Sequence, residues 1–381
     1  MIEAPGFLLT VLAFALVIGP LIFVHEMGHY LVGRWFGVQV EAFSIGFGRE
    51  VAGLTDRHGT RWKFCVLPLG GYVKFAGDMG PASTADPAWR QLPPEQRART
   101  FQAKPVWQRA LIVAAGPAIN FALAILILAG FALAYGDSRT PATVGSVMPN
   151  SAAAVAGLVP GDRVKALGGR SVDTFDDMVR YVQIRAGEPI AVRYVRAGRT
   201  TERTIVAGTQ TLRDRFGGEH KLGLLGIGPT RAVYVPVAPL DAPAVAVRRT
   251  SQIVTMMVDT LSQVVTGRRS VKELGGPISI ARASGQQMAL GMPEFVFLIA
   301  LVSINLGFIN LLPVPMLDGG HLLFYAIEAI KGAPVAAATQ DWAFRGGLLA
   351  VLALMVLVTF NDLGSLGVWQ GIGRGLAGLI G

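Results

Sequence analysis

Two histidines and a glutamate stand together near residue 25, and these residue types can hold a metal ion. The stretch Val24-His25-Glu26-Met27-Gly28-His29 follows the pattern H-E-x-x-H. On a helix, residues four apart lie on one face, so His25 and His29 can bind the same ion. Zinc lowers the pKa of a bound water towards about 7, and Glu26 could take the proton. With 5 histidines in 381 residues, chance produces this motif roughly 0.002 times per chain.

The motif ends an apolar segment that is long enough to enter a membrane. Residues 7–24 carry no charge. At 1.5 Å per residue, the helix from Phe7 to His25 is about 27 Å long, against a hydrocarbon core of about 30 Å. The histidines should therefore lie inside a bilayer near one boundary, with a path for water. Unliganded histidines at this depth are costly, which argues against a purely structural pair.

A third ligand is needed, because catalytic zinc usually has three protein ligands and an open position. The best candidate is Asp318, in Asn310-Leu311-Leu312-Pro313-Val314-Pro315-Met316-Leu317-Asp318-Gly319-Gly320-His321. It follows the uncharged run 295–317, where an isolated carboxylate would be costly. The prolines break a helix there, and unwound backbone at this depth must line a cavity or be buried in protein. His321 competes as a ligand, although a polar residue at the membrane boundary is the simpler reading. Weaker alternatives farther from the bend are Glu328 and Asp362.

Together the two motifs resemble the site-2 protease family of intramembrane zinc metalloproteases, and the match is close to the bacterial regulator of sigma-E protease branch. Further likeness lies in residues 68–74, 115–121, 275–281 and 360–362, so that the resemblance covers nearly the whole chain. It implies zinc as cofactor, bound by His25, His29 and Asp318. It also implies that Glu26 is the general base and that Asn310 positions substrate.

The resemblance further implies a sheet beside the active site that reaches back towards the membrane. The β-prone runs 40–47, 61–67 and 72–75 would form it. From their pattern alone, an ordinary cytoplasmic hairpin is the favoured reading. An exposed edge could bind an unwound substrate as an added strand. We therefore expect Gly70, Gly71 and Tyr72 to contact substrate.

Four uncharged runs predict a polytopic α-helical membrane protein with about four transmembrane helices. It would carry one extracytoplasmic PDZ-like α+β domain and a cytoplasmic, membrane-associated β-hairpin region. The first apolar run lacks the basic start and cleavage site of a signal peptide. We expect these parts: helix 1 with the H-E-x-x-H motif in 1–35, a loop with the β region in 36–107, helix 2 in 108–136, the PDZ-like domain in 143–230, a periplasmic amphipathic segment in 241–292, helix 3 with the aspartate motif in 293–330, and helix 4 in 344–363.

The PDZ-like domain is indicated by short β-prone runs and by the stretch Gly157 to Val164, which resembles the signature of bacterial PDZ domains. Only one copy is visible, whereas some relatives have two in tandem. Residues 242–266 are amphipathic and could pack on this domain or lie along the membrane surface. Within the second apolar run, Asn120 is expected to satisfy backbone freed by Pro117 rather than to contact substrate.

The distribution of basic residues predicts the orientation in the membrane. Eleven lysines and arginines lie between residues 34 and 109, and none precedes the first apolar run. The positive-inside rule then places this loop in the cytoplasm. The termini and the PDZ-like domain would be periplasmic, with the active site near the cytoplasmic face of a bacterial inner membrane.

The composition disfavours several classes of protein. Only 15% of residues are charged and the net charge is +9, against about 25% charged in soluble domains. A disordered chain, a disulfide scaffold (Cys65 is the single cysteine) and a nucleic-acid partner are disfavoured. The predicted function is proteolysis of single-span membrane proteins within the bilayer, such as anti-sigma factors or signal-peptide remnants. The alternatives are a membrane-anchored zinc protease acting on soluble chains, a PDZ scaffold and a metal transporter.

Overall fold

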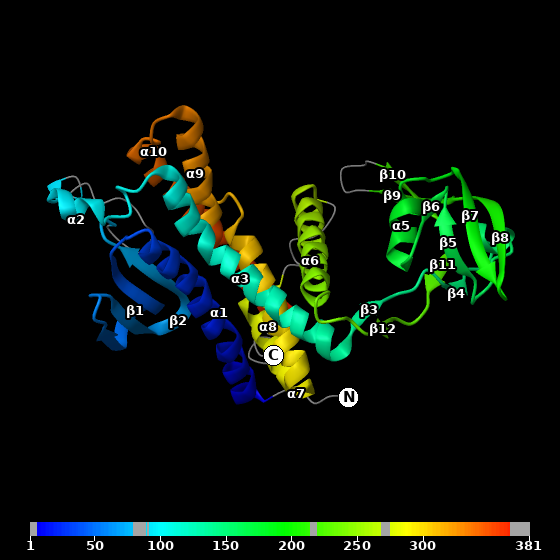
Figure 1. Ribbon diagram of the computed structural model, residues 1–381, viewed down its shortest axis with the longest axis horizontal. Coiled ribbons are helices and arrows are strands. Elements are labelled where there is room, and N and C mark those ends of the chain that lie inside the picture. Colours follow the sequence, from blue (N-terminus) through cyan, green and yellow to red (C-terminus); the bar gives the residue numbers. More distant parts are fainter. Residues whose placement is uncertain (1–5, 79–88, 90, 214–218, 268–274, 366–381) are drawn as a thin grey trace, which may run out of the picture. The chain divides into compact units, whose positions relative to one another are not determined.

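The computed structural model describes residues 6–78, 89, 91–213, 219–267 and 275–365, and it separates into two compact units (Figure 1). One unit comprises residues 1–128, 247–258 and 271–381, and the other comprises residues 129–246 and 259–270. Parts of the predicted 36–107 loop and of the predicted 241–292 segment lie outside the described residues.

Four helices are long and apolar enough to cross a bilayer. They are α1 (Phe7–Trp35), α3 (Val106–Tyr135), α8 (Met292–Asn310) and α10 (Ala337–Ser365). The third apolar run continues to residue 317, yet α8 ends at Asn310. Residues 311–317 instead form turns that lead into α9 (Asp318–Lys331), because Pro313 and Pro315 have no amide hydrogen to continue a helix.

Strands β1 (Val40–Thr55) and β2 (Arg61–Phe75) form an antiparallel sheet in the first unit. Each strand bends back on itself, so β1 pairs twice: Phe43 lies opposite both Val73 and Trp62. The resulting order of segments is 71–75, 40–47, 61–67 and 50–55, with 71–75 at one edge. The sheet contacts α1 (Figure 1).

The bends in this sheet occur at glycines. Gly46 and Gly48 have φ of 91° and 89°, and Gly70 has φ of 158°. Side chains other than hydrogen are strained in this backbone region, so glycine permits the fold-back. The ordinary hairpin favoured by the sequence pattern alone is therefore a four-segment sheet.

A buried cluster joins the sheet to the helices. It is made mainly of aromatic and branched side chains from α1, both strands, α3 and α9, together with Phe101 in the segment after α2 (Pro94–Ala98). Its largest members include Tyr30, Phe43, Phe101, Ile112 and Tyr325. Burial of this apolar surface fixes the sheet and α9 against α1, at the level of the H-E-x-x-H motif.

Helix α7 (Pro277–Leu290) packs against α1, α8 and α10. Its own residues supply no side-chain N-cap. The carboxylate of Asp362 on α10 does so instead, accepting hydrogen bonds from the Ser279 amide at 3.0 Å, the Ser279 hydroxyl at 2.6 Å and the Gly276 amide at 3.3 Å. Helix α10 is thereby tied to the start of α7.

The second unit is rich in strands. Its four-stranded sheet has the order β6-β5-β7-β8, with β5 at Arg163–Leu167, β6 at Arg170–Ser171, β7 at Pro189–Arg196 and β8 at Arg199–Val206. The other strands pair in twos: β3 (Asp137–Arg139) with β12 (Val233–Val235), β4 (Val144–Val147) with β11 (Ile227–Pro229), and β9 (Gly208–Arg213) with β10 (Glu219–Leu224). Helices α4 (Ala152–Val155) and α5 (Phe175–Gln183) complete this unit, and α6 (Ala242–Val265) contributes residues to both units.

Local signals explain the helices of the second unit. Ser151 caps α4 by accepting from the Ala154 amide at 3.2 Å. Thr174 and Asp177 form a capping box at the start of α5. Asp162, in the segment with the PDZ-like signature, accepts two hydrogen bonds from Arg196, each at 2.6 Å. The main apolar cluster among its described residues includes Leu167, Met178 and Val192, and a smaller one is formed by Ala132, Ala242 and Val245.

Candidate metal centre

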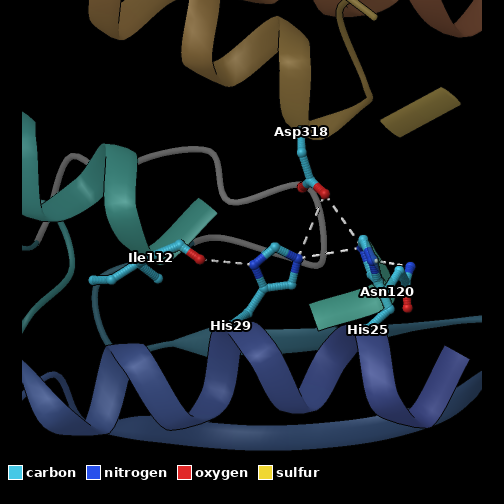
Figure 2. A network of polar contacts seen from close by, with 5 residues as sticks. All are labelled: His25, His29, Ile112, Asn120 and Asp318. Carbon is cyan, nitrogen blue, oxygen red and sulfur yellow. Dashed lines mark hydrogen bonds and ion pairs between the residues drawn. The ribbon is translucent and has the colours of Figure 1, made fainter. Parts of the chain in front are cut away.

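His25 and His29 occupy successive turns of α1 and point to the same place (Figure 2). Their rings are 4.9 Å apart between centroids, and their Nε2 atoms are 3.3 Å apart. Both side chains are about 10% exposed. The spacing of four residues on a helix thus produces the shared face that the sequence predicts.

Asp318 reaches the same point from the first residue of α9. Its Oδ2 atom lies 3.2 Å from His25 Nε2 and 3.6 Å from His29 Nε2. An ion pair at 2.6 Å between Arg109 of α3 and Glu328 of α9 holds α9 in place farther along its length. The Arg109–Glu328 pair also accounts for Glu328, which is not part of the three-donor group.

The three donor atoms fit a zinc ion. They form a triangle with edges of 3.2, 3.3 and 3.6 Å. Ligands about 2.0–2.1 Å from a tetrahedral zinc lie about 3.4 Å from each other, so one ion can reach all three donors. In addition, Oδ2 of Asp318 is buried and has no hydrogen-bond partner among the described residues. A buried carboxylate oxygen in that state is well suited to a cation.

The second nitrogen of each histidine also has a partner. Nδ1 of His29 lies 2.9 Å from the carbonyl oxygen of Ile112, to which it can only donate. His29 therefore carries its hydrogen on Nδ1 and leaves the lone pair of Nε2 for a metal.

Asn120 of α3 provides the corresponding contact to His25. Its side-chain nitrogen Nδ2 lies 3.0 Å from Nδ1 of His25 (Figure 2), and its Oδ1 is buried without a partner among the described residues. If Nε2 of His25 offers its lone pair to a metal, Nδ1 carries the hydrogen, and the Asn120 amide then has to be turned over so that Oδ1 accepts it. Asn120 is fully buried, and its backbone carbonyl accepts a hydrogen bond from the Ser303 hydroxyl at 2.8 Å.

Two glycines leave room for the site. A Cβ atom at Gly116 of α3 would collide with Nε2 of His29 and would lie 2.8 Å from Cε1 of His25. A Cβ atom at Gly71 of β2 would lie 2.9 Å from Cγ of Glu26. Both distances are below normal carbon contacts, so any larger residue would displace the site side chains.

A cavity of about 530 Å³ surrounds these groups. Its lining includes His25, Glu26, His29 and Asp318, and it also includes the predicted substrate contacts Asn310, Gly70, Gly71 and Tyr72. His321 lines the cavity as well, but it is not part of the three-donor group. Apolar side chains from α1, α3, α8, α10, the β1–β2 sheet and the turn before α9 also line it.

Sequence reasoning missed the roles of two residues. Asn120 was expected to satisfy backbone near Pro117, and instead its side chain contacts His25. A signal was present, because a buried amide inside a membrane helix is costly without a partner. Gly116 precedes Pro117 and had no such signal. Asp362, a weak ligand candidate, caps α7.

Comparison with known proteins agrees with the presence of a metal centre in this chain. The model of the family described as "Peptidase family M50" matches residues 13–354. The chain is 47% identical to "Putative zinc metalloprotease Atu1380" of Agrobacterium fabrum, with 95% of this chain and 98% of that protein covered. It is 35% identical to "Metalloprotease MmpA" of Caulobacter vibrioides, with 97% and 98% covered.

The similarity to two solved structures covers only part of the chain. The PDZ domain of an SdrC-like protein from Listeria monocytogenes is 19% identical, with a TM-score of 0.19, and the match covers 23% of this chain and 85% of that chain. The corresponding domain from Listeria innocua is 22% identical, with a TM-score of 0.20, and covers 25% and 99%.

Proposed function

This chain belongs to peptidase family M50 and is a zinc metalloprotease of the membrane, and we propose that it cleaves single-span membrane proteins within the bilayer. The observation that carries the proposal is the donor triangle of His25, His29 and Asp318. Two of its corners lie on an apolar helix long enough to span a membrane. A protease that acted only on soluble chains would be expected to carry these residues on a polar helix.

Each residue of the centre has a role in this proposal. His25, His29 and Asp318 hold the zinc ion, which, when bound, polarises the scissile carbonyl and acidifies a water. Glu26 lines the same cavity. Its carboxylate takes a proton from the attacking water and later passes that proton to the departing amine. Asn120 and the Ile112 carbonyl keep the two imidazoles in the required tautomer.

The edge segment 71–75 of β2 is the proposed substrate-binding strand. Within the described residues it pairs on one side only, with β1. Gly71 and Tyr72 line the metal cavity. A peptide bond in a helix is shielded, so a substrate must become extended before water can attack it. Pairing with this edge would hold the extended chain next to Glu26. Asn310, which also lines the cavity, would orient the substrate there.

The orientation in the membrane and the class of substrate also belong to the proposal. We place the metal centre near the cytoplasmic face and the PDZ-like part of the second unit, about residues 143–230, in the periplasm of a bacterial inner membrane. The distribution of basic residues supports this orientation. The β-rich unit would select substrates, such as anti-sigma factors or signal-peptide remnants, by the part of each substrate that lies outside the membrane.

The test is the variant Glu26→Gln in the full-length protein in lipid nanodiscs. We expect it to keep its zinc, measured by elemental analysis, and to lose cleavage of a single-span model substrate. His25→Ala should lose both. Equal turnover by Glu26→Gln and the wild type would refute the role of Glu26. Cleavage of soluble casein at the rate of the membrane substrate would favour a protease of soluble chains.

A further inference from the structure

A second cavity, of about 210 Å³, lies at the carboxyl end of α1 and is lined by basic residues. Arg34, in the last turn of α1, and Arg99, which follows α2, line it together with residues 37–39. Lys104 reaches the same place: a Cβ atom built on Gly37 would lie 3.9 Å from its Nζ. Three cations therefore converge on one short turn of backbone.

These cations form no ion pair within the part of the chain that the structure describes: Arg34, Arg99 and Lys104 have no carboxylate within salt-bridge distance there. Glu41 and Glu95 line a neighbouring cavity that shares Arg99, and Glu41 is paired with Lys74. The carbonyl groups at the end of α1 are not available as acceptors for these cations. The oxygens of residues 32, 33 and 34 already accept hydrogen bonds from the amides of Phe36, Val38 and Gly37. The cavity thus offers positive charge and hydrogen-bond donors to an anion.

Aromatic side chains beside this cavity indicate the level of the membrane–water boundary. Trp35 is 80% exposed and Trp107 is 58% exposed. Phe36 lies between them, with its ring 5.4 Å from each indole between centroids. Tryptophans gather at membrane interfaces, where an amphipathic ring meets both headgroups and acyl chains. These residues lie at the end of α1 and the start of α3, two helices that can span a bilayer.

We propose that this cavity binds the phosphate of an anionic phospholipid headgroup, while the acyl chains of that lipid lie against the exposed Trp35 and Trp107. Guanidinium groups match phosphate oxygens in two-point hydrogen bonds. A lipid is favoured over free phosphate because the aromatic flank places the cavity at headgroup depth.

The bound lipid would also affect the sheet of β1 and β2 beside the metal centre. The cavity wall continues directly into β1 through Val38 and Gln39. The Gln39 amide donates a hydrogen bond to the Arg99 carbonyl at 2.9 Å. This bond already joins the segment before β1 to the segment after α2. A headgroup that bridges Arg34 and Arg99 would hold the start of the sheet against the end of α1. The lipid would therefore support the sheet without entering the metal cavity.

The experiment is native mass spectrometry of the full-length protein titrated with phosphatidylglycerol or with phosphatidylcholine. We expect tight binding of phosphatidylglycerol and little of phosphatidylcholine. Each lost cation should weaken binding about fivefold, and the pair Arg34→Gln with Arg99→Gln about 25-fold. Arg97→Gln is the matched control, because Arg97 lies on α2, is exposed and does not line the cavity. The charge-conserving pair Arg34→Lys with Arg99→Lys should lose less binding than the glutamine pair, because it keeps the charge, but more than Arg97→Gln, because an ammonium group cannot make the two-point contact. Zinc content reports folding of every variant.

Three results would overturn the proposal. The first is phosphatidylglycerol binding by the folded double glutamine variant with wild-type affinity. The second is displacement of the lipid by inorganic phosphate at the same concentration, which would identify a site for free anions. An equal loss of binding in Arg97→Gln would show diffuse attraction to a basic surface and would also contradict a defined site.

Discussion

Asn120 is predicted to control the zinc affinity of this centre without being a ligand. The substitution Asn120→Leu keeps nearly the same shape but removes the amide, whose oxygen is the acceptor that Nδ1 of His25 needs when Nε2 binds zinc. In this buried place, an N–H group without a partner costs about 1–3 kcal/mol. That cost corresponds to zinc binding weaker by about 5- to 150-fold, a span that brackets the roughly 10- to 100-fold loss typical for such outer contacts to metal ligands.

The assay is competition for zinc between the purified full-length protein and a chromophoric chelator of known affinity. Asn120→Asp retains an acceptor at the same position, so its zinc affinity should equal or exceed that of the wild type. Ser303→Ala is the matched control, because it removes the hydrogen bond to the Asn120 backbone and leaves the amide side chain in place. Saturating zinc should restore most of the cleavage by Asn120→Leu. Wild-type zinc affinity in folded Asn120→Leu would refute the reasoning.

Two further predictions concern a steric contact and an acid-sensitive ion pair. Gly116→Ala places a methyl group against both imidazoles, so we expect zinc affinity to fall at least tenfold; an unchanged affinity in the same chelator assay would contradict this contact. In the second unit, burial raises the pKa of the Asp162 carboxyl, but hydrogen bonds from Arg196 and from the Val159 amide outweigh it and leave the pKa below its usual value. Because the folded pKa is lowered, the pair stabilises the unit at neutral pH, and this stabilisation is lost as the pH falls below about 4. Calorimetry of the full-length protein should show that Asp162→Asn flattens this acid dependence, and an unchanged slope would count against it.

The candidate site shows which parts of the structure a sequence can reveal. His25 and His29 lie on the same face of α1 because they are four residues apart on a helix, which can be predicted without knowledge of the fold. Asp318 is far away in the chain, and it could be selected because an isolated carboxylate at membrane depth requires a partner. The roles of these residues, and those of Glu26, Asn310 and Tyr72, stay predictions until the variants are measured.

Other features depended on how distant elements meet. Asn120 satisfied the same depth argument, but its partner depends on the rotation of α3 relative to α1, which sequence periodicity does not determine. The sheet of β1 and β2 is a similar case. Three β-prone runs were visible, yet the double pairing of Phe43 depends on bends at glycines that also occur in ordinary turns. Long-range register was therefore the missing information.

The donor triangle has a consequence for the assembly of the membrane part. About 290 residues of chain separate His29 from Asp318. A zinc ion held by both would act as a crosslink that closes this very long loop, and it would draw α3 in through Asn120 and Ile112. Catalytic readiness and cohesion of the helices would then depend on the same ion. Removal of zinc by a chelator should therefore weaken the packing of the helices as well as abolish proteolysis.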